Sequence, residues 1–282
     1  MKVVSEISKK YERQFLDSMD LLNITRPDVL CRATEHIKEQ IELAKKIEKN
    51  GFTYMTKTGL VFDTSKFADY AKFANLKLEE MEAGARVEVD VEKKQVWDFL
   101  LWVTNQPNHI MKWRSPWGEG FPGWHLECSA MGTKYLGEEF DIHGGGMDLM
   151  FPHHECEIAQ NSAALGKETV KYWMHNNMIT INGQKMGKSL GNFITLDEFF
   201  TGKHDLLKQA YSPMTIRFFI LQAQYRSTVD FSNEALQASE KGMQRLMEAY
   251  RRLNSLTVSA QSTIDVKGLR KSCEDAMSDD LN

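Results

Sequence analysis

A cysteine, a histidine and a glutamate in the middle of the chain have side chains of the types that bind transition metals. His153 and Glu157 lie four positions apart, just after Pro152. Proline is favoured in the first turn of a helix, so we expect a helix to begin here and to place the imidazole and the carboxylate on one face. Cys128 lies upstream and can supply a thiolate. Sulfur, nitrogen and oxygen donors together suit Zn²⁺ better than Ca²⁺ or Mg²⁺, which prefer oxygen alone.

Two neighbouring residues compete for the same role. His154 and Cys156 are also metal-ligand types, and they lie about 100° around the predicted helix from His153 and Glu157 respectively. The sequence contains no CxxC pair, and a histidine and an acid at helical spacing also occur on ordinary core or surface faces. From spacing alone, both a zinc site and a purely structural role remain open.

Hydrophobic periodicity predicts the elements that precede this site. Residues 5–23 and 34–50 have the pattern of amphipathic helices, the second with Thr34 as N-cap and Gly51 as its C-terminal stop. Residues 52–104 alternate short β-like runs with polar turns, which indicates a small α+β subdomain. The β-like runs are FTYMT (52–56), LVFDT (60–64) and RVEVDV (86–91).

The middle of the chain predicts a loop and two strands. Residues 113–124 are rich in Trp, Pro and Gly, which is typical of an ordered loop. Residues 140–143 predict a short buried strand, and the glycines 144–146 after it would let backbone approach a ligand closely. Residues 172–181 predict another strand, which ends in the hairpin signal Asn182-Gly183.

Lysines and helices dominate the C-terminal third. Lys185 and Lys188 lie three apart in a glycine-bearing loop and can neutralise phosphate charge, although surface lysines are common. Residues 196–238 predict helices interrupted at 211–213, and residues 234–258 predict a long amphipathic helix. The basic stripe of that helix suits either nucleic-acid phosphates or a solvated face.

Composition excludes several protein classes. The chain of 282 residues has a net charge of −4, so nucleic-acid binding would need a local basic face. Its 4 cysteines are irregularly spaced, which argues against a disulfide framework and favours a reducing cytoplasm. No apolar run approaches the length of a membrane span, and no signal peptide opens the chain.

Three blocks of the sequence resemble the signatures of cysteinyl-tRNA synthetases, a family of class I enzymes. They are PGWHLECSAM (122–131), DIHGGGMDLMFPHHECEIAQ (141–160) and KMGKSLGNF (185–193). The resemblance implies an α/β fold: a partial Rossmann-type class I catalytic domain with an α+β connective insertion, followed by an α-helical region. The implied divisions are the end of the first Rossmann half (1–31), the insertion (32–117), the second Rossmann half with the zinc-site residues (118–183), the KMSKS-like loop with the stem-contact region (184–233), and the start of a helical bundle (234–282).

The resemblance assigns a metal site and a substrate pocket. Cys128, His153 and Glu157 match three of the family's four zinc ligands, and the fourth belongs to a CGPTVY-like block that this sequence does not contain. His143 and Trp124 match residues of the cysteine pocket. Phe121 stands where family members often carry an arginine, so any polar contact of that arginine is missing here.

The resemblance also assigns an ATP site. Asp148 is placed near the adenosine ribose, while Lys185 and Lys188 match the catalytic lysines of the KMSKS loop, Lys188 also as an ATP contact. Gly187 replaces the first serine of that motif but leaves both lysines in place.

The implied reaction is the ligation of L-cysteine to tRNA(Cys). ATP, with Mg²⁺, activates cysteine to cysteinyl-adenylate, and the acyl group then passes to the tRNA. The resemblance implies a cytoplasmic enzyme that is a monomer at full length. The sequence has no HIGH motif and stops inside a DDLNTP-like block, so we expect a fragment that lacks the first half of the nucleotide-binding fold and the C-terminal tail. The alternatives are a cysteine-amino-sugar ligase of thiol biosynthesis and a non-catalytic tRNA-binding remnant.

Overall fold

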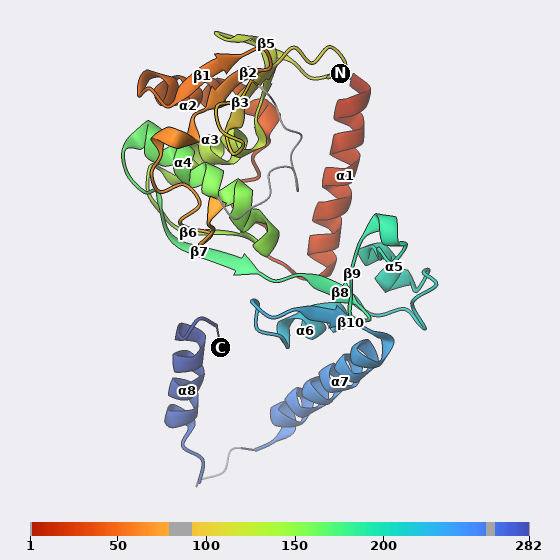
Figure 1. Cartoon of the computed structure of the whole chain (residues 1–282). Helices are drawn as coiled ribbons and strands as arrows, with labels where there is room; N and C mark the ends of the chain where they lie inside the picture. Colours follow the sequence, from red (N-terminus) through yellow and green to blue (C-terminus); the bar gives the residue numbers. More distant parts are fainter. Residues whose placement is uncertain (1, 79–91, 258–262, 282) are drawn as a thin grey trace. The chain divides into compact units, whose positions relative to one another are not determined.

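The computed structural model describes residues 2–78, 92–257 and 263–281 (Figure 1). These form two compact units, which are described separately below. The first consists of Met1–Val4 and Pro27–His175, and the second of Ser5–Arg26 and Asn176–Asn282. The predicted β-run at 86–91 lies outside the described residues. No helix in the described ranges is both long enough and apolar enough to cross a membrane.

An antiparallel sheet of five strands, in the order β1-β2-β3-β5-β4, forms the frame of the first unit. Two of the predicted β-runs are confirmed as its first two strands. The third strand supplies the fully buried Leu101 and Trp102 to the core. The strands are β1 (Thr53–Thr56), β2 (Gly59–Phe62), β3 (Phe99–Thr104), β4 (Trp113–Ser115) and β5 (Gly118–Pro122).

The prediction of a loop at 113–124 was wrong, because β4 and β5 form a hairpin there. Glycine content misled the prediction. Gly120 lies so close to β3 that a Cβ at this position would be 1.9 Å from the carbonyl oxygen of Val103. Glycine at this position therefore allows the backbones of β5 and β3 to approach closely within the sheet, and it does not mark a loop.

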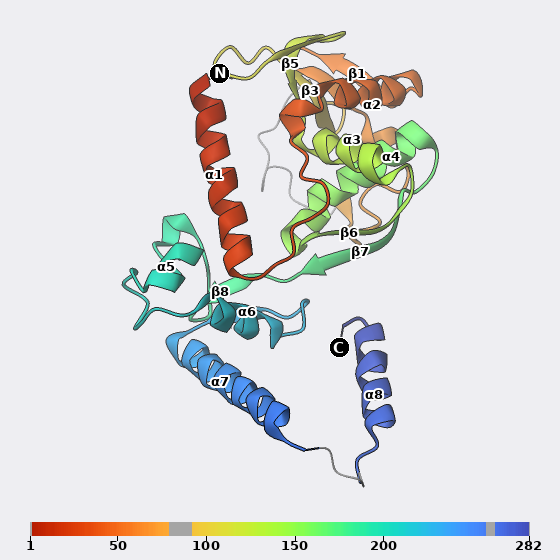
Figure 2. The same ribbon diagram turned by 180° about the vertical axis from the view of Figure 1, so that it is seen from behind.

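Three helices pack together and against this sheet: α2 (Ile37–Lys49), α3 (Trp124–Leu136) and α4 (Glu155–Leu165). Both views show them side by side (Figures 1 and 2). Leu43, Leu126 and Ala159, one from each helix, join the same buried cluster as Leu101. Because burial of apolar surface stabilises this layer, the helices that carry the candidate ligands have fixed positions.

The second predicted helix begins later than expected. The chain first forms a 3₁₀ turn (Ala33–Glu35), and α2 follows with His36, rather than Thr34, at its N-cap. The His36 ring is buried and fixed at both nitrogens, by the carbonyl of Arg32 at 2.7 Å and the hydroxyl of Tyr135 at 2.7 Å. This tertiary contact outweighs the capping preference of threonine.

Strands β6 (Phe140–Gly146) and β7 (Val170–Asn176) pair with each other, and α4 connects them in the sequence. The predicted strand at 140–143 is confirmed, but the prediction that it is buried and ends before the glycines was wrong. The glycines 144–146 belong to the strand, and its side chains are exposed or only half-buried.

The second unit contains α1 (Lys2–Leu21, from Ser5 onwards), which confirms the first predicted helix. A sheet of three strands, in the order β10-β8-β9, follows. Its hairpin turn at Asn182-Gly183 is confirmed, with φ of 50° and 76°. The sequence did not predict β10. The elements are β8 (Ile179–Ile181), β9 (Gln184–Lys185), α5 (Leu196–Thr201), α6 (Pro213–Leu221), β10 (Val229–Phe231), α7 (Asn233–Ser255) and α8 (Val266–Ser278).

Candidate metal centre

The candidate ligands lie on two neighbouring helical segments of the first unit. Cys128 lies in the second turn of α3. A kinked segment (Met150–His154), extended at Phe151, holds His153 and continues directly into α4, which holds Glu157. As the spacing predicted, His153 and Glu157 lie one helical turn apart on one face, with Nε2 and Oε1 3.0 Å apart.

The fold brings the three side chains together. One ligand atom from each of Cys128, His153 and Glu157 lies within 4.8 Å of the other two. His153 and Glu157 are buried and Cys128 is half-buried. A thiolate, an imidazole and a carboxylate that converge in this way form a donor set that suits Zn²⁺.

The orientation of the two buried groups also fits a shared ion. Although His153 Nε2 lies 3.0 Å from Glu157 Oε1, the two are not aligned for a hydrogen bond, and Oε1 accepts none within the part of the chain that is described. A buried carboxylate oxygen without a partner is costly, and a cation between the two groups would satisfy it.

Charge is distributed unequally over this site. Burial opposes ionisation of Glu157, but the contacts with His143 and His153 outweigh it and lower its pKa to about 2. Burial, with Glu157 and Glu127 nearby, raises the pKa of the Cys128 thiol to about 12. The site therefore holds one anion at neutral pH, and a bound cation would favour loss of the thiol proton.

The two competing residues of the sequence analysis have different surroundings. His154 belongs to a second convergent set with His143 and Glu157, again within 4.8 Å, and its Nδ1 lies 2.7 Å from Nε2 of His175. Cys156 instead points into the core, where it is 1% exposed. Cys156 is thus absent from both ligand sets.

A histidine that the sequence analysis missed stands behind His153. The Nδ1 of His125 lies 2.8 Å from the Nδ1 of His153, and burial, with the nearby His153, lowers the pKa of His125 to about 4. Its spacing was informative, since His125 and Cys128 lie three apart and share one face of a helix. Trp124 is 58% exposed and lies with its ring centroid 4.4 Å from that of His153.

The remaining predicted site residues are exposed. Asp148 lies in a short 3₁₀ turn (Met147–Leu149) after β6. Lys185 and Lys188 belong to the second unit, are exposed, and form no ion pair with a described residue. Asn192 closes their loop, since its side chain accepts from the amide of Gly187 at 2.9 Å and donates to the carbonyl of Lys185 at 3.0 Å.

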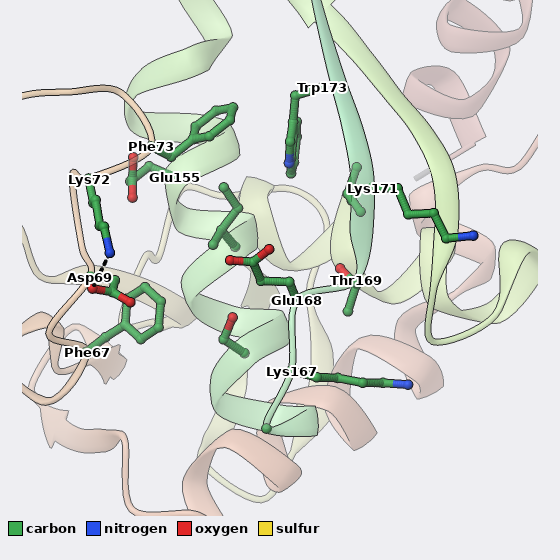
Figure 3. Close-up of a pocket in the computed structure, with 14 residues that line it drawn as sticks. Phe67, Asp69, Lys72, Phe73, Glu155, Lys167, Glu168, Thr169, Lys171 and Trp173 are labelled. Atoms are coloured by element: carbon green, nitrogen blue, oxygen red, sulfur yellow. Dashed lines mark hydrogen bonds and ion pairs between the residues drawn. The ribbon is translucent and has the colours of Figure 1, made fainter.

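A cavity of about 600 Å³ lies beside α4 (Figure 3). Phe73 and Trp173 stand next to each other on its wall, with ring centroids 5.1 Å apart. Glu155 also lines the cavity. Its Oε2 accepts a hydrogen bond from the amide of Ala74 at 3.0 Å, which connects the segment around Ala74 to α4. Trp173 also contacts His143, at 4.7 Å between ring centroids, so the cavity borders the second convergent set, of which His143 is a member.

Comparison with known proteins gives a family match. The family model described as tRNA synthetases class I (C) catalytic domain matches residues 1–241. The cysteine–tRNA ligases of Parabacteroides distasonis and Bacteroides fragilis are 60% and 59% identical to 98% of this chain. The chain spans only 57% of the length of either relative.

Two solved structures share the fold at low sequence identity. Mycobacterium tuberculosis methionyl-tRNA synthetase in complex with methionyl-adenylate has a TM-score of 0.64 and 13% identity, over 98% of this chain and 67% of that chain. Thermus thermophilus arginyl-tRNA synthetase has a TM-score of 0.51 and 12% identity, over 98% of this chain and 53% of that chain. At these identities the similarity concerns the fold alone.

Proposed function

Because the chain belongs to the family of class I (C) tRNA synthetase catalytic domains, we propose that the whole protein is a cysteine–tRNA ligase. In the first step the carboxylate of L-cysteine attacks the α-phosphorus of ATP, and pyrophosphate leaves. In the second step a hydroxyl of the terminal tRNA ribose attacks the acyl carbon of cysteinyl-adenylate, and AMP leaves. The observation that carries the proposal is the convergence of Cys128, His153 and Glu157 in a chain so similar to enzymes of that name.

The metal pocket is proposed to select the amino acid. Zn²⁺ held by Cys128, His153 and Glu157 would supply a contact for the substrate thiolate, which the hydroxyl of serine binds poorly. His143 lies 3.4 Å from Glu157 and would form part of the pocket wall. Trp124 covers His153 and would shield the site from water. A merely apolar pocket would discriminate by only about 10–200-fold.

Three exposed residues are proposed to serve ATP. Lys185 and Lys188 would neutralise charge that develops on the phosphates as pyrophosphate departs, together with the Mg²⁺ that accompanies ATP. Asp148 would accept a hydrogen bond from the adenosine ribose. The exposure of both lysines supports this, since neither charge is engaged by a described acid.

The acceptor is proposed to be tRNA(Cys) rather than an amino sugar. The cysteine–tRNA ligases that resemble this chain at 57–60% identity favour the tRNA acceptor. A cytoplasmic location fits the four free cysteines.

Exchange of labelled pyrophosphate into ATP by the whole protein tests the proposal. We expect exchange with L-cysteine, almost none with L-serine, and transfer of labelled cysteine to tRNA(Cys). Exchange that is equal for both amino acids would contradict the proposed role of the metal pocket. Acylation of an amino sugar instead of tRNA would favour the alternative ligase.

A further inference from the structure

The contact between two histidines decides which nitrogen of His153 faces the candidate metal site. The two Nδ1 atoms of His125 and His153 lie 2.8 Å apart, a hydrogen-bond distance. A neutral imidazole carries one N–H, so one of these nitrogens donates and the other accepts. The direction of this bond fixes the tautomer of His153, because a proton on its Nδ1 leaves a lone pair on its Nε2.

The opposite direction leaves a proton without a partner. If His125 donated, the proton of His153 would sit on Nε2, where the nearby acceptor is Glu157 Oε1 at 3.0 Å. Those two atoms are not aligned for a hydrogen bond, and the His153 ring is 4% exposed, so water would not readily replace that acceptor. A buried N–H without an acceptor is unfavourable, so donation from His153 to His125 is the favoured arrangement.

Packing holds His125 in place for this role. The ring of Phe99 contacts it edge-on, with centroids 5.6 Å apart, and Trp124 stacks beside it at 6.0 Å. His125 lies on α3 one helical turn from Cys128, so a single helix supplies both a candidate ligand and the support for a second. In many sites a metal-bound histidine is oriented by an acceptor for its other ring N–H, which is a carboxylate, a backbone carbonyl or a water molecule.

We propose that His125 is a positioning residue, which accepts a hydrogen bond from Nδ1 of His153 and so directs the Nε2 lone pair into the metal site. The inference rests on the metal centre of the proposed function and adds to it a residue outside the ligand set. This positioning role requires a hydrogen-bond acceptor at the place of His125 Nδ1. A purely structural role would require only a side chain of similar size, whether apolar or aromatic.

Three variants of the 282-residue chain separate these roles. His125→Leu removes the acceptor, His125→Asn keeps a polar group near the place of Nδ1, and His125→Gln moves it further out. His36→Leu is a matched control, since it removes another buried imidazole of the same unit. Affinity for Zn²⁺ is measured by competition with a chromophoric chelator, the geometry by the d–d absorption of bound Co²⁺, and the His153 tautomer by ¹⁵N NMR.

We expect His125→Leu to weaken Zn²⁺ binding by about 10–100-fold and to change the Co²⁺ spectrum. His125→Asn should retain most of the affinity for Zn²⁺. His36→Leu should bind Zn²⁺ about as tightly as the wild type, because His36 has no contact with the candidate ligands among the hydrogen bonds of its ring. If the Leu variant does not fold, Asn and Gln still decide the matter, with tighter binding expected for Asn.

Two results would overturn the inference, and they can be told apart. If the wild-type chain binds neither Zn²⁺ nor Co²⁺, the metal centre itself is wrong, and the inference fails with it. If the wild type binds but His125→Leu binds equally well, or Asn is no better than Gln, the metal centre stands and His125 only fills space.

Discussion

At the scale of single residues, Glu157 organises the centre of the first unit. Its carboxylate is 2% exposed, lies within 3.4 Å of two imidazoles, and belongs to both convergent ligand sets. A buried anion is tolerated only with compensating partners. The histidines provide part of this compensation, and a cation shared with Cys128 would complete it.

We therefore expect Cys128→Ala to lose most of its bound zinc. This substitution removes the only sulfur donor of the proposed ligand set. The loss of Zn²⁺ affinity should therefore exceed the loss of about 10–100-fold that is typical when the hydrogen-bond partner of a ligand is removed. Zinc per chain is measured by mass spectrometry of the purified protein after dialysis against a weak chelator.

Cys156→Ala is the matched control. This cysteine lies 28 positions further along the chain, in the core, with its Sγ 3.4 Å from the hydroxyl of Tyr70. We expect its substitution to leave zinc content unchanged and to lower the free energy of unfolding by about 1 kcal/mol. Zinc loss from Cys156→Ala but not from Cys128→Ala would contradict the prediction and show that Cys156 supplies the thiolate.

At the scale of elements, glycines control how closely the strands of the first sheet approach. Gly120 has no room for a side chain, since a Cβ would lie 1.9 Å from backbone oxygen of the next strand. Gly132 lies on α3, where a Cβ would be 3.8 Å from the ring of Phe140, an ordinary van der Waals contact. The same substitution should thus have opposite consequences at these two positions.

We expect Gly120→Ala to lower the free energy of unfolding of the first unit by more than about 3 kcal/mol, because backbone atoms must move. Gly132→Ala should raise it by up to about 1 kcal/mol, since alanine is the better helix former. Urea denaturation followed by tryptophan fluorescence checks both. A Gly120→Ala variant as stable as the wild type would show that β3 and β5 can separate at little cost.

The loop that carries Lys185 and Lys188 provides a prediction about catalysis by the whole protein. We expect Lys188→Ala to reduce ATP–pyrophosphate exchange by about 10²–10³-fold, because one donor to the developing phosphate charge is lost. Zinc content should not change. Lys203→Ala, an exposed lysine of the same unit, is the control and should keep its activity; equal loss in both variants would indicate a general effect of charge.

The sequence predicted those elements for which local pattern and packing agree. Periodicity identified α1 and α7, the Asn182-Gly183 hairpin is confirmed, and the i,i+4 spacing correctly placed His153 and Glu157 on one face. The hairpin of β4 and β5 and the late start of α2 were missed. The hairpin is local, but its glycines were interpreted as a loop. The late start of α2 depends on the contact of His36 with Tyr135, which is distant in the sequence and which no local pattern encodes.

The approach of Cys128 to the other ligands illustrates what the residues alone could not provide. Nothing in the spacing between α3 and α4 required these helices to pack together. The resemblance to a known family supplied that expectation, and the structure shows the convergence. His125 was missed because its partner lies 28 positions away on another helix.

At the scale of the whole molecule, the fold class predicted from the sequence is confirmed. The family match covers residues 1–241, and a methionyl-tRNA synthetase shares the fold at a TM-score of 0.64. The chain nevertheless spans 57% of its cysteine–tRNA ligase relatives. The loop with Lys185 and Lys188 and the candidate metal centre belong to different units.

We expect the 282-residue chain alone to show no measurable cysteine-dependent ATP–pyrophosphate exchange, in contrast to the whole protein. The sequence contains no HIGH motif and no CGPTVY-like block, so the donors that these motifs supply in the resembling family are missing. Removing one preorganised donor typically costs about 10²–10³ in rate, and the loss of several should suppress turnover below detection. The exchange assay is run on both proteins at equal concentration. Cysteine-dependent exchange by the 282-residue chain, abolished by Cys128→Ala, would show that this part of the enzyme is catalytically sufficient.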